Sequence, residues 1–501
     1  MKCKIVLKDE VNCKIEGLAL TTRRKLEKKL KFLLPYAFHT PSYKLGRWDG
    51  CVGFFTTGGN TFINCLPTIL PILDEDRYEV EIEDERTAWK LDFPEITEGH
   101  FSHKVWPKKH PAAGEPVMLR DYQVEIINQF LANPQSLQEI ATGAGKTLIT
   151  AALSNLVEMS IDFETKVQQK LVTGKSAARS IVIVPNKDLV IQTEADYINL
   201  GLDVGVYFGD RKDLNKTHTI CTWQSLNIID KRFKDGESEY SLADFAENVV
   251  CLIVDEVHQA KADVLKKLLT GPFSNIPIRW GLTGTVPKEE WERLTITVGL
   301  GDVINKLAAS DLQDIGVLAS CEVNIIQLQD NVSYGNYQSE LTYLTTNKER
   351  LDYMATLIQS LADDGNTLVL VDRISAGEGL MERLGDHAVF VSGKMKSKDR
   401  KEEYDEISDS DNKIIVATYG VAAVGINIPR IFNLVLVEPG KSFVRVIQSI
   451  GRGIRKAKDK DNVRIWDITS SAKFSKRHLT ERKKFYKDAK YPFTVDKVEY
   501  K

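Results

Sequence analysis

The sequence predicts an α/β protein in which a small α+β domain precedes two parallel-sheet domains. The prediction rests on a series of short, continuous apolar runs separated by segments of helical length. These runs are SIVIVP (180–185), HTICTW (218–223), VVCLIVDE (249–256), NTLVLVD (366–372), KIIVATYG (413–420), FNLVLVEP (432–439) and NVRIWDI (462–468). Strands buried on both faces show this pattern, and the helical spacing predicts β-α-β units. The series breaks between Gly299 and Asp330, so we expect two such domains.

Length and composition are typical of a globular protein with several domains. The 501 residues suggest about three domains of about 150 residues each. Hydrophobic residues make up 43% of the chain and charged residues 27%, which excludes a disordered or collagen-like protein. No apolar stretch reaches about eighteen residues and the N-terminus has no apolar segment, so we expect neither a membrane span nor a signal peptide. The seven scattered cysteines form no CxxC pair, which favours a reduced, cytoplasmic protein without a zinc site.

Charge is unevenly distributed along the chain. Residues 1–48 hold twelve Lys and Arg against four acids, whereas residues 74–98 hold eleven acids against three basic residues. Between them the chain is rich in glycine and aromatic residues, which favours strands and tight turns, so we expect a small two-faced domain. Residues 473–501 are expected to form a basic helical tail. The net charge of −3 averages over these segments and does not exclude a polyanionic partner.

The strongest motif is ATGAGKT (141–147), which a segment of helical length follows. The glycines let backbone N–H groups approach an anion, and the helix N-terminus adds partial positive charge. Lys146 can reach the β- and γ-phosphates, and Thr147 can hold Mg²⁺. Ile140 stands where the fuller pattern has glycine, and a plain glycine turn before a helix is the alternative. The motif predicts a nucleotide-phosphate loop.

An acidic pair, Asp255 and Glu256, ends the apolar run at 249–254. Asp255 can bind Mg²⁺ through water, and Glu256 can orient and deprotonate an attacking water. Acids at a strand end are often only solvated. Their position downstream of a phosphate loop in the same α/β unit favours the catalytic function.

A third element, QSIGRGIR (448–455), lies in the second α/β unit. Arg452 and Arg455 are three residues apart, so on a helix they share a face. Two guanidiniums there could stabilise charge on a γ-phosphate held by the other unit. A solvated basic helix face is the alternative, but the second unit has no phosphate loop of its own, which favours the role in trans.

Taken in order, these motifs resemble those of superfamily 2 helicases. ATGAGKT, DEVH (255–258), LTGT (282–285) and QSIGRGIR resemble motifs I, II, III and VI. LRDYQ (119–123) resembles the adenine-reading Q motif. Motifs Ia, Ic, IV and V are matched by IVIVPNKDLVIQT (181–193), CTWQSL (221–226), LVLVDR (368–373) and ATYGVAAVGINIP (417–429). The resemblance covers about residues 119–455 and implies two tandem RecA-like domains with ATP between them.

Within this superfamily the chain resembles the phage UvsW-type branch-migration DNA helicases. YKLGRWDG (43–50) is similar to the N-terminal domain of that group, which binds double-stranded DNA, and VFVSGK (389–394) with Arg400 also matches. A hairpin turn with a core tryptophan is the alternative for Trp48-Asp49-Gly50. The expected domains are a DNA-binding domain over 1–104, a first RecA-like domain over 105–309 and a second over 310–501.

The resemblance implies ATP and Mg²⁺ as cofactors and gives each matching residue a role. Gln123 would pair with adenine beside Tyr122 and Arg120. The remaining nucleotide-contacting residues would be Thr142, Gly143, Ala144, Gly145, Lys146, Thr147 and Gly425. The catalytic residues would be Lys146, Asp255, Glu256, Gln448, Arg452 and Arg455, with Thr147 and Asp255 on Mg²⁺.

Further implied roles concern the coupling of nucleotide state to movement. Thr283 and Thr285 would link the nucleotide to interdomain closure, and His258 would bond across the cleft toward Gln448. Asn427 stands where the family's motif V usually has Asp, a departure that removes the negative charge from that position.

DNA is the expected partner, held through phosphates in a sequence-independent and salt-dependent way. The expected contacts are Pro185, Asn186, Thr222, Gln224, Thr418, Gly420, Trp48, Arg23 and Arg24. The basic run from Arg23 to Lys31 and the basic tail would add non-specific attraction. Whether an aromatic residue such as Phe54 or Phe55 separates the strands as a wedge is not decided by the sequence.

The expected activity is ATP-dependent unwinding or branch migration of forked and four-way-junction DNA, with recombination or replication proteins as further partners, in the host cytoplasm if the chain is phage-encoded. Two alternatives remain open: a DExH RNA helicase, and a duplex-DNA translocase subunit without strand separation. A non-catalytic DNA-annealing or architectural protein is disfavoured, because Lys146, Asp255, Glu256, Arg452 and Arg455 are all intact.

Overall fold

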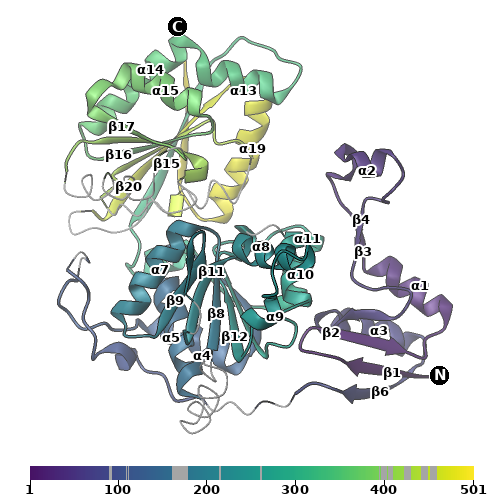
Figure 1. Ribbon diagram of the computed structural model, residues 1–501. Coiled ribbons are helices and arrows are strands. Elements are labelled where there is room, and N and C mark those ends of the chain that lie inside the picture. Colours follow the sequence, from purple (N-terminus) through teal and green to yellow (C-terminus); the bar gives the residue numbers. More distant parts are fainter. Residues whose placement is uncertain are drawn as a thin grey trace. The chain divides into compact units, whose positions relative to one another are not determined.

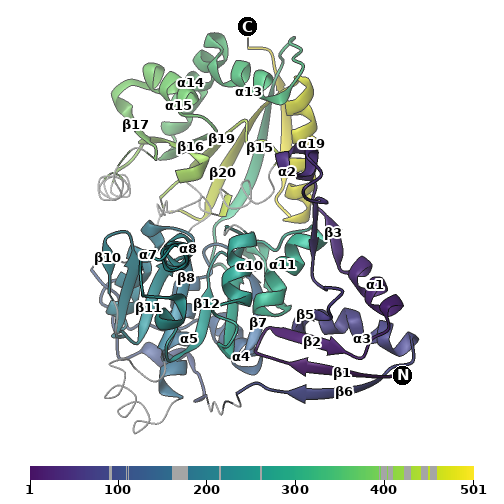
Figure 2. The ribbon, with the colours of Figure 1, turned by 45° about the vertical axis from the view of Figure 1, so that its right-hand side comes forward.

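The computed structural model describes residues 1–87, 89, 93–108, 110, 112–160, 179–213, 216–259, 262–393, 395, 403, 410–421, 430–441, 450–451 and 460–500. The chain divides into two compact units, residues 1–139 with 146–306 and residues 140–145 with 307–501 (Figures 1 and 2). Among the described helices, none is long and apolar enough to cross a membrane.

The first unit is built on an eight-stranded sheet in the order β10-β9-β11-β8-β12-β13-β7-β14. In chain order the strands are β7 (Gln135–Ile140), β8 (Arg179–Val184), β9 (Val204–Phe208), β10 (Arg211–Lys212), β11 (His218–Thr222), β12 (Val249–Val254), β13 (Ile278–Thr283) and β14 (Val303–Leu307). The strands from β9 to β7 pair in parallel. Every residue of β8, β11, β12 and β13 is buried, which confirms the prediction from the apolar runs at 180–185, 218–223 and 249–256.

Helices follow the strands of this sheet, as expected of β-α-β units. They are α4 (Asp121–Ala132), α5 (Lys146–Met159), α7 (Lys187–Asn199), α8 (Trp223–Lys234), α9 (Leu242–Phe245), α10 (Ala262–Thr270) and α11 (Glu290–Leu300), with 3₁₀ turns η3 (Glu98–Phe101) and η4 (Val257–Gln259). Helix α5 packs against α4 and α7, and α10 packs against α8 and α11. One large apolar core runs under α8–α11, centred on residues such as Leu252, Phe245 and Phe273.

A second, four-stranded sheet forms the N-terminal part of the same unit, in the order β5-β2-β1-β6. Its elements are β1 (Lys2–Leu7), β2 (Asn12–Glu16), α1 (Leu20–Lys29), β5 (Asn60–Phe62), η2 (Ile63–Cys65), α3 (Leu66–Glu75) and β6 (Glu79–Asp84). Strands β1 and β6 are parallel, and Lys4 forms an ion pair with Glu83 across them. The basic start and the acidic segment of the sequence therefore neutralise each other along one strand pair.

A two-stranded arm extends from this sheet (Figure 1). We define the arm as residues 31–53: β3 (Lys31–Leu33) and β4 (Cys51–Gly53) pair antiparallel, and η1 (Ala37–His39) and α2 (Pro41–Lys44) lie at its end. Phe54 and Phe55, which follow the arm, are only 1% and 3% exposed. They belong to the core of the N-terminal sheet, so neither can act as a wedge in this conformation.

The N-terminal sheet is docked on α10 and α11. Asn12 Nδ2 donates to the Thr270 carbonyl at 2.8 Å, and Asn64 Nδ2 donates to the Thr297 carbonyl at 2.9 Å. Val298 of α11 is fully buried within the core of the N-terminal sheet. A shared apolar core joins the two sheets into one unit. The domain limits at 104/105 and 309/310 stay predictions.

The second unit has a seven-stranded sheet in the order β17-β18-β16-β19-β20-β15-β21, with all neighbours parallel. Its strands are β15 (Ser320–Leu328), β16 (Thr367–Val371), β17 (Ala388–Val391), β18 (Ile414–Thr418), β19 (Asn433–Val437), β20 (Asn462–Ser470) and β21 (Phe493–Val498). The helices with described bounds are α12 (Ala309–Asp314), α13 (Tyr337–Thr346), α14 (Lys348–Ala362), α15 (Ile374–Leu384), η5 (Gly385–His387) and α19 (Lys473–Asp488). The predicted fold class, α/β with two parallel-sheet domains, is confirmed.

The C-terminal segment contains the predicted basic helix and one further strand. Helix α19 forms as expected, but β21 then joins the sheet as an edge strand beside β15. Arg482 of α19 is fully buried and bonds both carboxylate oxygens of Asp467 at 2.8 and 2.9 Å. Arg482 and β21 are therefore part of the packed unit.

Candidate active site

The ATGAGKT segment is the turn from β7 into α5, since β7 ends at Ile140 and α5 begins at Lys146. Gly143 and Gly145 have φ of +95° and +80°, in the left-handed region that favours glycine. This backbone, together with the N-terminus of α5, forms a concentration of partial positive charge. The turn therefore fits a phosphate group.

The acidic pair lies at the carboxyl end of β12. The Asp255 N–H donates to the Ile183 carbonyl of β8 at 2.9 Å, and Asp255 Oδ1 accepts from the Glu256 N–H at 2.8 Å. Glu256 has φ of +49°, a conformation that costs a non-glycine residue about 1 kcal/mol or more and is common at functional sites.

A buried ion pair connects the phosphate loop to the acidic pair. Lys146 Nζ lies 2.9 Å from Glu256 Oε1, and the two side chains are 8% and 7% exposed. The other carboxylate oxygen, Oε2, accepts from the Gly284 N–H at 3.3 Å. Glu256 is therefore held on one side by motif I and on the other by motif III.

Motif II and motif III are also joined through His258. His258 Nδ1 lies 2.5 Å from Thr283 Oγ1, and the Thr283 hydroxyl donates to the Thr285 carbonyl at 2.8 Å. Because that hydroxyl has only one proton, it must accept from His258, which assigns the proton to Nδ1. Thr283 and Thr285 are thus positioned beside the acidic pair. The predicted bond from His258 to Gln448 stays a prediction, since Gln448 lies outside the described residues.

The Q-motif residues lie at the start of α4. Gln123 is 3% exposed, and its Oε1 accepts from the Arg120 N–H at 2.9 Å. Tyr122 is 9% exposed, and Arg120 is exposed. A carbonyl oxygen has two lone pairs, so the bond to Arg120 fixes the Gln123 amide and still permits a second bond. Pairing of Gln123 with adenine stays a prediction.

Two known protein families match the sequence of this chain. The family described as "Type III restriction enzyme, res subunit" matches residues 116–288, and "Helicase conserved C-terminal domain" matches residues 349–457. The first match contains the phosphate loop, the acidic pair and Thr283–Thr285 that the structure brings together. The chain is a superfamily 2 helicase of the DExH type.

The helicase resembles viral helicases over most of its length, as its motifs predict. The ATP-dependent DNA helicase uvsW of Enterobacteria phage T4 is 22% identical over 469 residues, which cover 90% of this chain and 87% of that protein. Putative helicase 22 of Sulfolobus islandicus filamentous virus is 24% identical over 496 residues, covering 91% of this chain and 79% of that protein. The fragment structure of a putative HsdR subunit of a type I restriction enzyme from Vibrio vulnificus YJ016 shares the fold, with a TM-score of 0.56 and 17% identity over 76% of this chain and 69% of that chain.

Motifs Ia and Ic of the helicase meet at the carboxyl ends of β8 and β11. Gln224 Nε2 donates to the Pro185 carbonyl at 3.3 Å. Asn186 Oδ1 caps α7, and Thr222 Oγ1 accepts from the Ser225 N–H and so caps α8. The Asn186 Nδ2 is buried and has no hydrogen-bond partner among the described residues. Contact of these four residues with DNA stays a prediction.

In the second unit, Thr418 ends β18 half-buried and Gly420 is exposed. Gly425, Gln448, Arg452 and Arg455 lie outside the described residues. In the first unit, Trp48 Nε1 donates to the Cys51 carbonyl at 3.1 Å within the arm. Arg23 Nη1 donates to the Thr57 carbonyl at 3.2 Å, and Arg24 is exposed.

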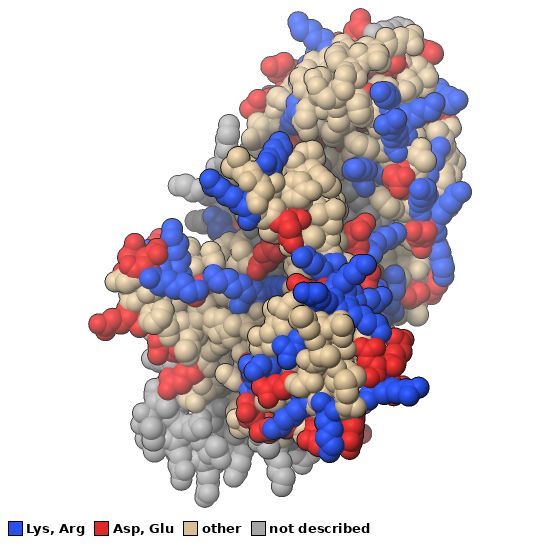
Figure 3. Space-filling view, turned by 90° about the vertical axis from the view of Figure 1, so that its right-hand side faces the viewer, with Lys and Arg blue, Asp and Glu red and all other residues tan. Residues whose placement is uncertain are grey.

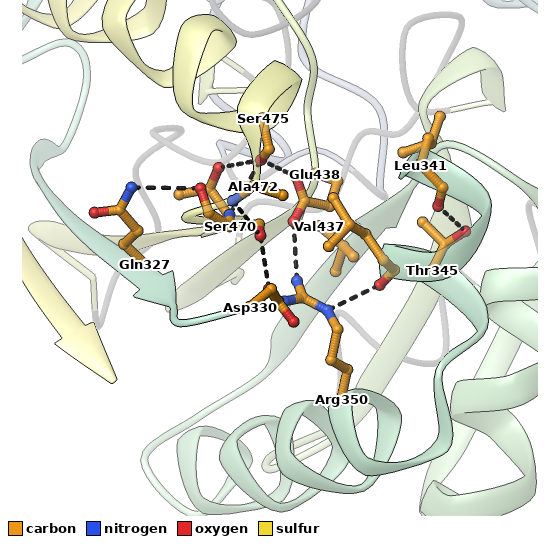
Figure 4. A network of polar contacts seen from close by, with 12 residues as sticks. Gln327, Asp330, Leu341, Thr345, Arg350, Val437, Glu438, Ser470, Ala472 and Ser475 are labelled. Carbon is orange, nitrogen blue, oxygen red and sulfur yellow. Dashed lines mark hydrogen bonds and ion pairs between the residues drawn. The ribbon is translucent and has the colours of Figure 1, made fainter. Parts of the chain in front are cut away.

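A buried network that sequence reasoning missed lies at the carboxyl ends of β15, β19 and β20 (Figure 4). Arg350 of α14 is fully buried, forms an ion pair with Asp330 and bonds Glu438 Oε1 at 2.9 Å. Ser470 Oγ donates to Asp330 at 2.6 Å, and Ser475 Oγ donates to Glu438 Oε2 at 2.7 Å. The network thus ties α14, three strand ends and α19 together.

Glu438 is the residue of this network closest to motif VI in sequence. It has φ of +43° directly after β19, and motif VI begins ten residues later. Burial raises the pKa of Glu438 to about 7, although Arg350 favours the charged form. A charged residue directly after an apolar strand, as in VLVEPG, was the available sequence signal. We interpret the network as fixing the position of Glu438, ten residues before motif VI.

Proposed function

We propose that this superfamily 2 helicase unwinds forked DNA and migrates four-way junctions. The chain is an ATP-dependent DNA helicase or translocase; forks and four-way junctions are the substrates we propose for it. The main structural support for ATP hydrolysis is the Lys146–Glu256 ion pair at 2.9 Å. The second oxygen of the Glu256 carboxylate accepts a hydrogen bond from the Gly284 N–H. The relative named as an ATP-dependent DNA helicase, which covers 90% of this chain, supports DNA as the polymer.

The residues of the site fit ATP with a divalent metal, which this helicase family uses. The left-handed turn at Gly143 and Gly145 suits phosphates, and we propose that Thr147 and Asp255 hold the metal. When bound, Mg–ATP supplies the phosphoryl group that is hydrolysed and a cation that neutralises its charge. We further propose that Gln123 selects adenine.

The chain's own contribution to hydrolysis follows from the pair. Lys146 pairs with the Glu256 carboxylate at 2.9 Å, and a phosphate would compete with that carboxylate for the ammonium group. Once Lys146 binds a phosphate, Glu256 Oε1 is released and can accept a proton from an attacking water. The Gly284 N–H keeps Oε2 in place during this exchange. We expect motif III to respond to the state of Glu256 through the Gly284 N–H, which bonds its carboxylate directly.

An RNA helicase and a duplex translocase without strand separation are the competing functions. The test is phosphate release by the full-length protein with single-stranded DNA, forked DNA, a four-way junction or RNA. We expect the strongest stimulation by forked and four-way DNA, and loss of turnover in Lys146→Ala. Lys234→Ala, an exposed lysine of the same unit, serves as the matched control and should keep full turnover.

Stimulation by RNA alone would refute the proposal, and stimulation without strand displacement would favour the translocase. Deletion of the N-terminal sheet is a poor test of its function, because Val298 would lose the apolar core around it. Point substitutions on the surface are preferable. Location in the cytoplasm and interactions with recombination or replication proteins belong to the same proposal.

A further inference from the structure

A cavity of about 760 Å³ lies in the first unit, where the N-terminal sheet meets the eight-stranded sheet. Its lining comes from the turn between β1 and β2, the segment after β6, the end of α4 and the first residues of β7 and β13. The phosphate loop and motif III lie at the opposite, carboxyl ends of β7 and β13. Cavities of about 300–1,000 Å³ typically hold small-molecule ligands. The cavity is therefore a candidate site separate from the candidate ATP site.

The Glu10 carboxylate is the buried charged group of this cavity. Glu10 is 8% exposed, and its main-chain N–H donates to the Ser274 carbonyl at 3.0 Å. Its Oε2 accepts from Gln135 Nε2 at 3.1 Å and from Arg86 Nη1 at 3.4 Å. In the part of the chain that the structure describes, no group donates a hydrogen bond to Oε1, which remains accessible to solvent. This second oxygen can accept a donor from a ligand in the cavity.

Arg86 does not fully compensate the charge of Glu10. Its guanidinium makes two bonds to Asp84, at 2.9 and 2.7 Å, whereas its bond to Glu10 is longer, at 3.4 Å. Burial raises the pKa of the Glu10 carboxyl, although Arg86 and Arg279 favour its charged form. The charged residues of the described lining are two acids and one arginine. The cavity therefore carries excess negative charge and attracts a cation.

Glu10 differs from the acidic residues on the protein surface. Figure 3 shows basic and acidic side chains interspersed over one face of the molecule. On β2 of the same sheet, for example, Glu16 pairs with Lys14 at 2.7 Å, and the Glu16 side chain is 47% exposed. Exposed pairs are screened by water and contribute little to binding or stability. Burial of Glu10 strengthens its attraction for a bound cation, because the effective dielectric constant around it is lower.

The other walls of the cavity include aromatic and apolar side chains. Trp89 is 45% exposed, and the Phe93 ring is tilted against Trp280 with ring centroids 6.3 Å apart. The apolar part of the lining is completed by Leu131, Pro134, Pro277 and Ile278. Aromatic faces attract cations, and apolar side chains accommodate a hydrocarbon chain. A metal ion fits poorly, because Mg²⁺ and Ca²⁺ need several oxygen ligands and no group of His, Cys, Asp and Glu among the described residues is arranged to hold one.

We propose that this cavity binds a small organic cation that carries an ammonium group on an unbranched hydrocarbon chain, the chemistry of an aliphatic polyamine. The ammonium group donates to Glu10 Oε1, the chain lies along Phe93 and Leu131, and the Trp89 ring covers it. A bound cation then joins the N-terminal sheet to the first residues of β7 and β13. The inference does not depend on which nucleic acid the helicase acts on.

The experiment is a calorimetric titration of the full-length protein with putrescine, a diamine, in the absence of DNA and nucleotide, which bind amines themselves. We expect saturable binding of one putrescine per chain. The urea midpoint should rise in its presence, because a ligand that binds only the folded state stabilises it. Butanediol, which has the same carbon chain with hydroxyl groups in place of the ammonium groups, should do neither.

Substitutions locate the site. Glu10→Gln should lower the affinity for putrescine by about 10- to 100-fold, the value of a hydrogen bond to a charged group. Trp89→Ala, at an exposed position, should lower the affinity by about 2- to 5-fold through loss of the cation–π contact. The matched control is Glu16→Gln, which removes an exposed acid of the same sheet and should bind putrescine like the wild type.

Two outcomes would overturn the inference. Absence of saturable putrescine binding to the wild type would exclude a cation site in this cavity. Equal affinity in the wild type, Glu10→Gln and Trp89→Ala would indicate that the amine binds elsewhere, on surface acids. If the urea transition shows that Glu10→Gln is unfolded, the affinity of Trp89→Ala decides between the site and its absence.

Discussion

Glu256→Gln tests the candidate site most directly, because it removes a charge and leaves the size of the side chain unchanged. Lys146 Nζ and Glu256 Oε1 are 2.9 Å apart, and at an effective dielectric constant of about 20 two unit charges at this distance attract by roughly 6 kcal/mol. Removing the Glu256 charge takes this attraction away from a buried ammonium. The expected cost to the free energy of unfolding is about 3–5 kcal/mol.

The same substitution should act in the opposite direction on nucleotide binding. In the wild type, a phosphate must compete with Glu256 for Lys146, whereas in Glu256→Gln this competition is gone. We therefore expect Mg–ATP to bind about 10-fold more tightly to the variant and to restore much of its lost stability. Hydrolysis should fall by about 10²- to 10⁴-fold, the usual contribution of a general base.

The measurements are urea unfolding with and without Mg–ATP, equilibrium nucleotide binding and phosphate release. Lys234→Met is the control, since it breaks the surface pair of Lys234 with Asp230 at 2.6 Å and should change none of these quantities measurably. An apo stability within 1 kcal/mol of the wild type would refute the buried pair in solution. Retained hydrolysis would exclude Glu256 as the base.

Three further predictions concern other parts of the molecule. Arg279 is fully buried and donates to four main-chain carbonyls near the ends of α10 and α11. Arg279→Met should therefore lower the free energy of unfolding by about 3–5 kcal/mol. An unchanged urea midpoint would contradict this expectation. Because the pKa of Glu438 in the folded state, about 7, exceeds its unfolded value near 4.3, its stabilising contribution is full below about pH 4 and is lost as the pH rises through 7. Hydrogen-exchange protection of β19 and β20 should therefore decline between about pH 4 and about pH 7, and Glu438→Gln should flatten this decline. Gln123→Ala should raise the KM for ATP about 10-fold and leave that for GTP unchanged, and equal effects on both nucleotides would exclude base reading by Gln123.

The sequence predicted the elements whose signals are local. The phosphate loop was recognisable because glycine, lysine and threonine occur at fixed spacing, and the strands at 180–185 and 249–254 because they are apolar throughout. Strand β7 was missed because it contains Ser136 and Gln138. Both are buried, and their polar groups bond main-chain carbonyls of Asn133 and Ile126. In a sequence pattern, a polar residue indicates a loop, because the hydrogen bond that satisfies its buried side chain is visible only in the structure.

The pairing of distant groups was not accessible from the sequence. Lys146 and Glu256 are 110 residues apart, and only the parallel order β8-β12-β13-β7 brings the phosphate loop beside the acidic pair. The acidic segment at 74–98 was predicted as one face of a small domain, but the register of β6 on β1 places its glutamates beside lysines. Likewise, Arg482 of the basic segment at 473–501 is not available at the surface, because it forms a buried ion pair with Asp467.

The sequence by itself determined the chemistry of this helicase, because the residue types that hold phosphates and activate water must occur in short, ordered motifs. The tertiary structure alone decided which charged and aromatic residues are available to a partner. Phe54 and Phe38 are both aromatic residues of one segment, yet packing buries the first and leaves the second half exposed. The physical reason is that exposure depends on which surfaces pack together, and a shared core with α11 is a property of the fold and not of any local pattern.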